Sequence, residues 1–150
     1  MAHIVWVTGE EKEFKIMERR VRSFARKALA LLRKSPCAME CVLVTPKTIH
    51  AWNKRYRGKD KPTTVLSFGP DGVVPHPELP KGVRYLGEIV LAPRVVAARG
   101  EDPYFLVLHS IFHLLGYTHG ERDARMRMER REQTLWRALK SKEHTRRLTL

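Results

Sequence analysis

The sequence predicts an α+β protein in which helices pack on a single small mixed sheet of about four strands. Three observations lead to this fold class. The chain has 150 residues, which suits a single domain, 1–150, with a core of its own. Its segments follow in the order β, α, β, α, β, β, α, α, α, which places one sheet against several helices. Residues 103–115 are apolar on nearly every side, as expected for a central helix.

The first half of the chain alternates between strands and helices. Residues 3–7 and the mostly apolar residues 39–45 are predicted strands. A helix is predicted from residue 11 to about 33, and Pro46 begins a short helix over about 47–56. The packing face of the longer helix recurs at spacings of three and four: Met17, Val21, Phe24, Ala28 and Leu31.

The second half has two strands and then three helices. β-Branched and aromatic residues predict strands at 63–68 and 83–91, joined by a loop rich in Pro and Gly. A short helix over 93–99 comes next. Asp102 and Pro103 suit the N-cap and first position of the central helix.

The last helix is predicted over about 121–140, and residues 141–150 are expected to be a frayed tail. Its packing face consists of Ala124, Met128, Leu135 and Leu139. Cys37 and Cys41 lie four apart on a strand, too far for a disulfide, so both are expected to be reduced thiols.

The charge balance indicates the class of partner. There are 29 Lys and Arg against 16 Asp and Glu, a net charge of +13, so nucleic acid is the first candidate and a merely solubilising surface is the alternative. The longest apolar run, 104–115, is too short to span a bilayer, and the amino-terminal residues lack a secretory pattern. We therefore expect a cytoplasmic protein without a membrane partner.

A candidate metal site lies in HSIFHLLGYTH, residues 109–119. His109 and His113 are four residues apart and share a helix face, Gly116 ends the helix, and the returning chain can bring His119 to the same ion. Three imidazole ligands suit one zinc ion per chain with its fourth position open, which is typical of catalytic zinc. The alternative is a pair of core histidines without a metal.

The spacing matches the zincin pattern H-E-x-x-H-x-x-G-x-x-H, so the central helix is expected to be a zincin-like metal helix. Ser110 stands where that pattern has its glutamate base. This substitution argues against an ordinary peptidase. A zincin-like metallopeptidase therefore remains only a minor alternative.

Three blocks of the chain resemble the YbeY-type endoribonucleases, which mature ribosomal RNA. Residues 109–119 resemble the family signature H-G-x-L-H-L-x-G-Y-D-H. Residues 53–68, NKRYRGKDKPTTVLSF, are similar to N-x-x-Y-R-x-K-D-x-P-T-D-V-L-S-F, and residues 86–89, LGEI, are similar to L-G-D-I. Three acids differ: Thr64 and Thr118 replace aspartates, and Glu88 is one carbon longer than aspartate.

The resemblance implies that His109, His113 and His119 bind zinc and that Arg57 is catalytic. It implies a cytoplasmic enzyme that cleaves single-stranded RNA, matures the 3′ end of small-subunit ribosomal RNA and contributes to ribosome quality control.

Independently of the resemblance, Arg55, Lys59 and Lys61 are candidate phosphate contacts because they lie in a basic loop beside Arg57. The nucleophile is either a zinc-activated water or a ribose 2′-hydroxyl. The principal alternative function is a non-catalytic, ribosome-associated RNA-binding protein in which zinc is structural.

Overall fold

The computed structural model describes residues 3–33, 35–71, 78–116 and 122–148, with the side chains of Asp123 and residues 141–148 left out. Its strands are β1 (Ile4–Gly9), β2 (Cys37–Leu43), β3 (Val65–Phe68) and β4 (Arg84–Leu91). Its helices are α1 (Lys15–Leu32), preceded by the 3-10 turn η1 (Lys12–Phe14), then α2 (Pro46–Arg57), α3 (Pro93–Ala98), α4 (Pro103–Leu114) and α5 (Arg122–Leu148). The predicted order of elements and the α+β class are confirmed.

The four strands form one mixed sheet, as predicted, and their order in the sheet is β1-β2-β4-β3. β1, β2 and β4 run parallel, and β3 runs antiparallel to β4. The register between β2 and β4 shifts at Ala38/Met39, and Met39 lies opposite Gly87, which has a φ of 133°. A Cβ on Gly87 would lie 2.1 Å from the Phe68 carbonyl oxygen, so glycine lets β3 approach β4 closely at this point.

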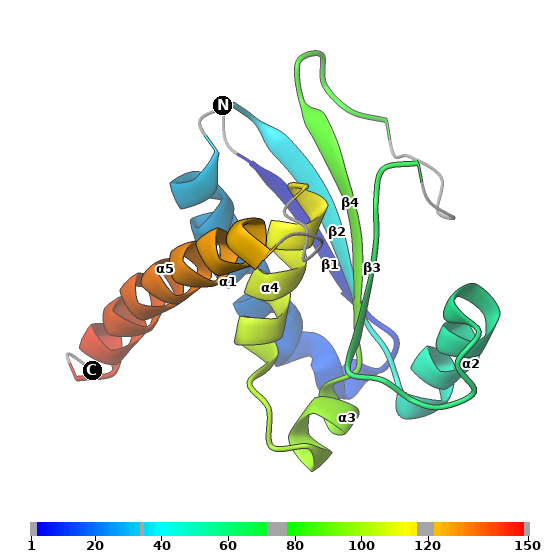
Figure 1. The fold of residues 1–150 in the computed structure, drawn as a ribbon. Helices are drawn as coiled ribbons and strands as arrows, with labels where there is room; N and C mark the ends of the chain where they lie inside the picture. The colour runs from blue at the N-terminus through cyan, green and yellow to red at the C-terminus, as the bar shows by residue number, and fades with distance from the viewer. Residues whose placement is uncertain (1–2, 34, 72–77, 117–121, 149–150) are drawn as a thin grey trace.

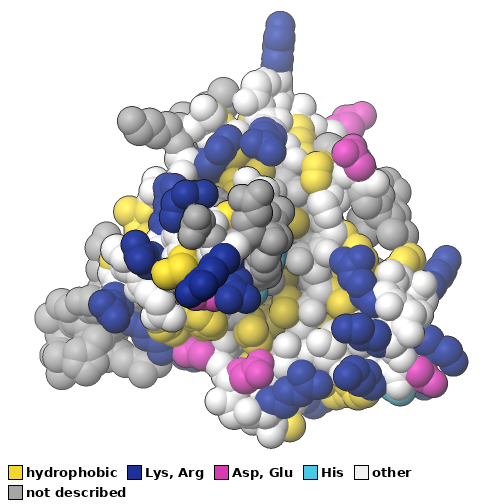
Figure 2. All heavy atoms as spheres, in the orientation of Figure 1, with side chains coloured by type: hydrophobic (Ala, Val, Ile, Leu, Met, Phe, Trp, Pro, Cys, Tyr) yellow, Lys and Arg dark blue, Asp and Glu magenta, His cyan; other side chains and the backbone are white. Residues whose placement is uncertain are grey.

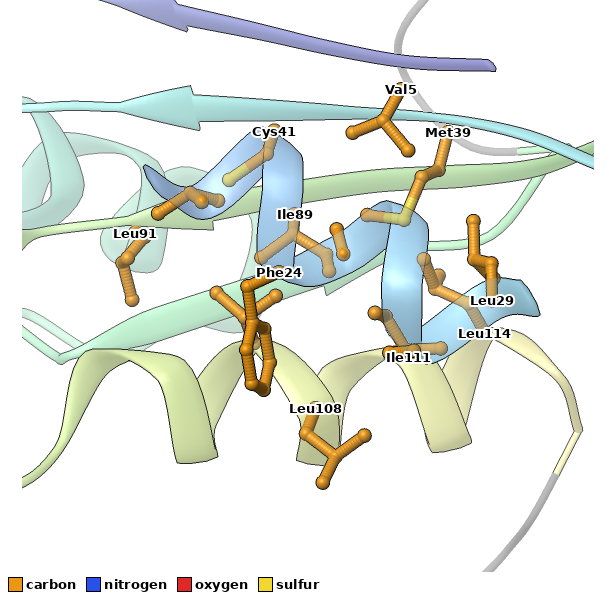
Figure 3. Packing of buried hydrophobic residues seen from close by; sticks show 14 of the residues in the cluster. Val5, Phe24, Leu29, Met39, Cys41, Ile89, Leu91, Leu108, Ile111 and Leu114 are labelled. Carbon is orange, nitrogen blue, oxygen red and sulfur yellow. The ribbon is translucent and has the colours of Figure 1, made fainter. Parts of the chain in front are cut away.

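The main core lies between the sheet and the helices α1, α4 and α5, which occupy one side of the sheet in Figure 1. In Figure 3, side chains of β2 and β4 such as Met39 and Ile89 converge with Phe24 of α1 and Ile111 of α4. α2 lies at the opposite side, where a smaller cluster forms around Ile49 and Phe68.

The central helix α4 begins as the sequence predicts. The Asp102 carboxylate accepts hydrogen bonds from the backbone N–H groups of Tyr104 and Phe105, at 2.9 and 3.4 Å, which satisfies two amides at the helix start. The same carboxylate accepts a bond from the Lys140 ammonium at 3.0 Å, so the start of α4 is tied to α5. α4 contacts α1, α5, β3 and β4, which confirms its central position.

Two details of the prediction were wrong. Leu31 is 50% exposed, whereas Leu29 is buried and lies near Leu114 of α4 in Figure 3, because α4 covers that side of α1. α5 continues to Leu148, past the predicted end at residue 140, since residues 141–148 contain neither Gly nor Pro to stop a helix.

Two further expectations can be compared with the structure. Cys37 and Cys41 are buried free thiols, as predicted. Within the described ranges, no helix is both long and apolar enough to cross a membrane.

Candidate active site

Two of the predicted metal ligands meet on one face of α4. The Nε2 atoms of His109 and His113 lie 3.0 Å apart, and their rings are 4.6 Å apart at 83°. Two nitrogens bound tetrahedrally to one zinc ion at about 2.0–2.1 Å are separated by about 3.3 Å. The pair therefore fits a shared zinc ion after a shift of a few tenths of an ångström.

Glu132 of α5 holds the other side of the first histidine. Its carboxylate lies 2.9 Å from Nδ1 of His109, and the residue is only 4% exposed. A carboxylate at Nδ1 keeps the ring proton on that nitrogen, so the Nε2 lone pair is directed toward a metal. The arrangement is typical of a metal ligand and its supporting carboxylate.

Glu132 was not predicted as a site residue, although the sequence contained a signal. It falls between Met128 and Leu135 on the packing face of the last helix; Met128 is buried in the core and Leu135 packs against it. An acid in the middle of an apolar stripe needs a polar or charged partner, because burying an unpaired carboxylate is costly.

The third predicted ligand, His119, lies outside the described residues, as does Thr118. Among the residues that the structure does describe, no three His, Cys, Asp or Glu side chains form a group able to hold a metal ion. Ser110, which replaces the zincin glutamate, is 2% exposed and lies in the core, so it takes no part in the histidine pair.

Arg57, the predicted catalytic arginine, is the last residue of α2. Its guanidinium donates a hydrogen bond to the Ser67 carbonyl oxygen at 2.8 Å and lies over the Phe68 ring, 5.1 Å from the ring centre. Both partners belong to β3, a strand that α4 also contacts. Arg57 and the histidine helix therefore border the same strand.

Of the three predicted phosphate contacts, two line one cavity and the third does not. Lys59 and Lys61 line a cavity of about 370 Å³ together with Arg57. Arg55 is not among the residues that line this cavity, and its guanidinium instead lies 5.2 Å from the centre of the Tyr56 ring. Figure 2 shows Lys and Arg side chains gathered in two regions of this face, one over α5 and one over α2 and the chain that follows it.

The acid in the third family block is buried in the sheet. Glu88 is 4% exposed, and its Oε2 atom has no hydrogen-bond partner among the described residues. Burial, together with the smaller effect of the negative charge of Glu40, its partner in register on β2, raises the pKa of Glu88 to about 7. Thr64, in place of a family aspartate, is also buried, and its carbonyl accepts from the Ala92 amide at 2.9 Å.

Comparison with known proteins gives consistent matches. The family model described as Endoribonuclease YbeY matches residues 7–140. The Endoribonuclease YbeY of Paramagnetospirillum magneticum is 37% identical over 109 residues, covering 67% of this chain and 66% of the relative. That of Anaeromyxobacter dehalogenans is 35% identical over 144 residues, covering 90% of this chain and 71% of the relative.

The matched part of the chain spans 66% of the length of the Paramagnetospirillum relative, just under two thirds. A Thermotoga maritima protein with a solved solution structure aligns with 93% of this chain and 93% of its own, at 21% identity and a TM-score of 0.47.

Proposed function

Because the chain belongs to the YbeY endoribonuclease family, we propose that it is a zinc-dependent endoribonuclease that cleaves single-stranded RNA. One observation carries this proposal. The Nε2 atoms of His109 and His113 lie 3.0 Å apart, close to the spacing of two nitrogens on one zinc ion, while the buried carboxylate of Glu132 holds Nδ1 of His109. A backbone carbonyl would satisfy Nδ1 in a core histidine pair, whereas a carboxylate at Nδ1 is the common support of a metal-bound histidine, and the His109 side chain is 32% exposed rather than buried in the core.

In the proposed site, His109, His113 and His119 hold one zinc ion per chain. When bound, zinc supplies Lewis acidity, which activates a water or a ribose 2′-hydroxyl and polarises the phosphate. Glu132 fixes the orientation of the His109 ring. The +13 net charge favours a polyanionic substrate.

Arg57 supplies the second positive charge at the reacting phosphate. Its contacts with Ser67 and Phe68 hold the guanidinium at β3, so little side-chain entropy is lost when it binds a phosphate oxygen. A guanidinium placed this way stabilises charge that develops on the non-bridging oxygens during cleavage.

The biological assignment is also part of the proposal. We propose a single-domain cytoplasmic protein that acts on ribosomal RNA in the small ribosomal subunit, at the 3′ end of its RNA, and contributes to ribosome quality control. Mapping of small-subunit RNA 3′ ends, in cells that carry either the natural protein or its His113→Ala variant, tests this assignment. Identical ends in both cells would contradict it.

The activity itself is tested with end-labelled single-stranded RNA and a duplex of the same sequence. We expect cleavage of the single strand only, lost on chelation, restored by zinc and absent in His113→Ala. That variant, purified in parallel, also controls for contaminating nucleases, and its circular dichroism shows whether it folds. Cleavage that survives both chelation and the substitution would contradict the proposal.

The test also separates the alternatives. RNA binding without any product, in zinc-loaded protein, would favour the non-catalytic RNA-binding protein with a structural zinc. Cleavage of an unstructured peptide above the rate of His113→Ala would favour the metallopeptidase, which Ser110 and the positive charge disfavour.

A further inference from the structure

The cavity of about 370 Å³ beside Arg57 is open to solvent and is lined by parts of the chain that are distant in sequence. The end of α2 and the loop after it contribute Arg57, Lys59 and Lys61, and the fourth cation is Arg99, the residue that directly follows α3. Four cations therefore line one cavity, and none of the described residues that line it is acidic. The histidines of α4 are not part of its wall.

The backbone that carries the two lysines is held in place by α2. Asn53 is 3% exposed, and its side-chain amide donates to the Lys61 carbonyl at 2.8 Å. The backbone carbonyl of Asn53 accepts from the Lys59 amide at 3.2 Å. A buried asparagine thus ties the backbone of both lysines to the helix, so the positions from which their side chains reach the cavity are fixed before any ligand binds.

The two arginines are also held against the cavity wall. Arg57 donates to the Ser67 carbonyl, and Arg99 donates to the Pro62 carbonyl at 3.3 Å. Each of these bonds uses one terminal nitrogen of a group that has five N–H donors. Donors therefore remain on both guanidiniums for an anion in the cavity.

The acid of this loop is engaged elsewhere. Asp60 stands between the two lysines in sequence, but its carboxylate lies 2.8 Å from Nε2 of His50 and 3.9 Å from the Lys54 ammonium. The hydrogen bond from His50 lowers the pKa of Asp60, with a further contribution from Lys54. Asp60 consequently leaves the cavity charge unneutralised.

We propose that this cavity binds one phosphate group of the RNA strand, at a subsite distinct from the metal histidines, and that Arg99 and Lys61 contact that phosphate. The subsite rests on the proposed function for the identity of its ligand. In the proposed function Arg57 acts at the reacting phosphate, and because Arg57 also lines this cavity, the subsite would hold a phosphate of the same strand near the cleavage point.

Binding is tested with metal-free, full-length protein and a short oligouridylate labelled at its 3′ end, by fluorescence anisotropy over a range of salt concentrations. Arg99→Gln and Lys61→Gln should each weaken binding severalfold. Each should also lower the slope of log Kd against log salt by about 0.7, the value for one phosphate contact to a single strand. Lys47→Gln is the matched control, because it removes one exposed cation from α2 without touching the cavity.

Oligouridylates with and without a 5′-phosphate identify the source of the phosphate. If Arg99→Gln weakens binding of both oligouridylates equally, the subsite binds an internal phosphodiester. If Arg99→Gln weakens binding only of the oligouridylate with a 5′-phosphate, the subsite binds the end of the strand. The subsite would be overturned if the slope of log Kd against log salt for Arg99→Gln and Lys61→Gln equalled that for Lys47→Gln. It would also be overturned if the natural protein bound no RNA.

Cleavage by the zinc-loaded protein separates this inference from the proposed function. Arg99→Gln should raise KM while kcat stays within about twofold, because the lost contact serves binding equally in the ground state and the transition state. A fall in kcat with unchanged KM would contradict a binding subsite. If the natural protein cleaved no RNA but the salt-dependence slopes were still reduced in Arg99→Gln and Lys61→Gln, the endoribonuclease proposal would be refuted and the subsite would remain supported.

Discussion

Replacing Glu132 with Gln tests whether this residue supports a metal ligand. The carboxylate lies 2.9 Å from Nδ1 of His109 and is 4% exposed, so the substitution changes a buried, charge-assisted hydrogen bond into a neutral one of the same shape. Charged hydrogen bonds contribute about 1.5–3 kcal/mol and neutral ones about 0.5–1.5. The difference between the middles of these ranges, about 1.3 kcal/mol, corresponds to roughly a tenfold loss of zinc affinity.

The measurement is a competition titration of zinc against a chelating dye, with urea unfolding of the metal-free protein alongside it. Glu129→Gln is the control. Glu129 lies on the same helix, but it is exposed and makes only a long ion pair, of 3.9 Å, with Arg125. We expect a tenfold weaker zinc complex for Glu132→Gln and an unchanged one for Glu129→Gln. Equal zinc affinities for the two variants would refute the supporting role of Glu132.

Three further predictions concern catalysis, helix capping and pH. Arg57→Gln should lower the cleavage rate at saturating RNA by about 100-fold while zinc content, measured by metal analysis, stays unchanged; a comparable rate would exclude Arg57 from the chemistry. Asp102→Ala removes the α4 cap and the ion pair with Lys140, so urea unfolding should show a loss of about 1–2 kcal/mol, and an unchanged midpoint would contradict the capping role. Because the pKa of Glu88 is raised to about 7 from 4.5, the folded state retains a proton that the unfolded state releases, and stability should fall as pH rises from about 4.5 to 7. In Glu88→Gln the free energy of unfolding, taken from unfolding curves at several pH values, should no longer show this fall. An unaltered pH dependence in the variant would rule out Glu88 as its source.

Features encoded by neighbouring residues were predicted well. Asp102 followed by Pro103 was expected to begin α4, and it does so at that position. The spacing of His109 and His113 placed both rings on one helix face, where their nitrogens lie 3.0 Å apart. Both predictions depend only on the geometry of one helical turn, which hardly changes from one protein to another.

Features that depend on how elements pack were missed. Leu31 has the spacing of a core residue but is exposed, because α4 covers the neighbouring side of α1. Glu132 has the spacing of the α5 packing face, but its role follows from the position of His109, which is 23 residues away in sequence. Periodicity identifies which face of a helix is buried, but not which residue it meets.

The sequence by itself determined the order of strands and helices, the apolar central helix, the family blocks and the excess of positive charge, since each of these depends on composition or on residues a few positions apart. Only the tertiary structure decided that Glu132 supports His109, that Asp60 turns toward α2, and that Arg99 joins Lys59 and Lys61 around one cavity. Such contacts arise when helices and strands pack, and short-range spacing cannot specify which distant side chains then meet.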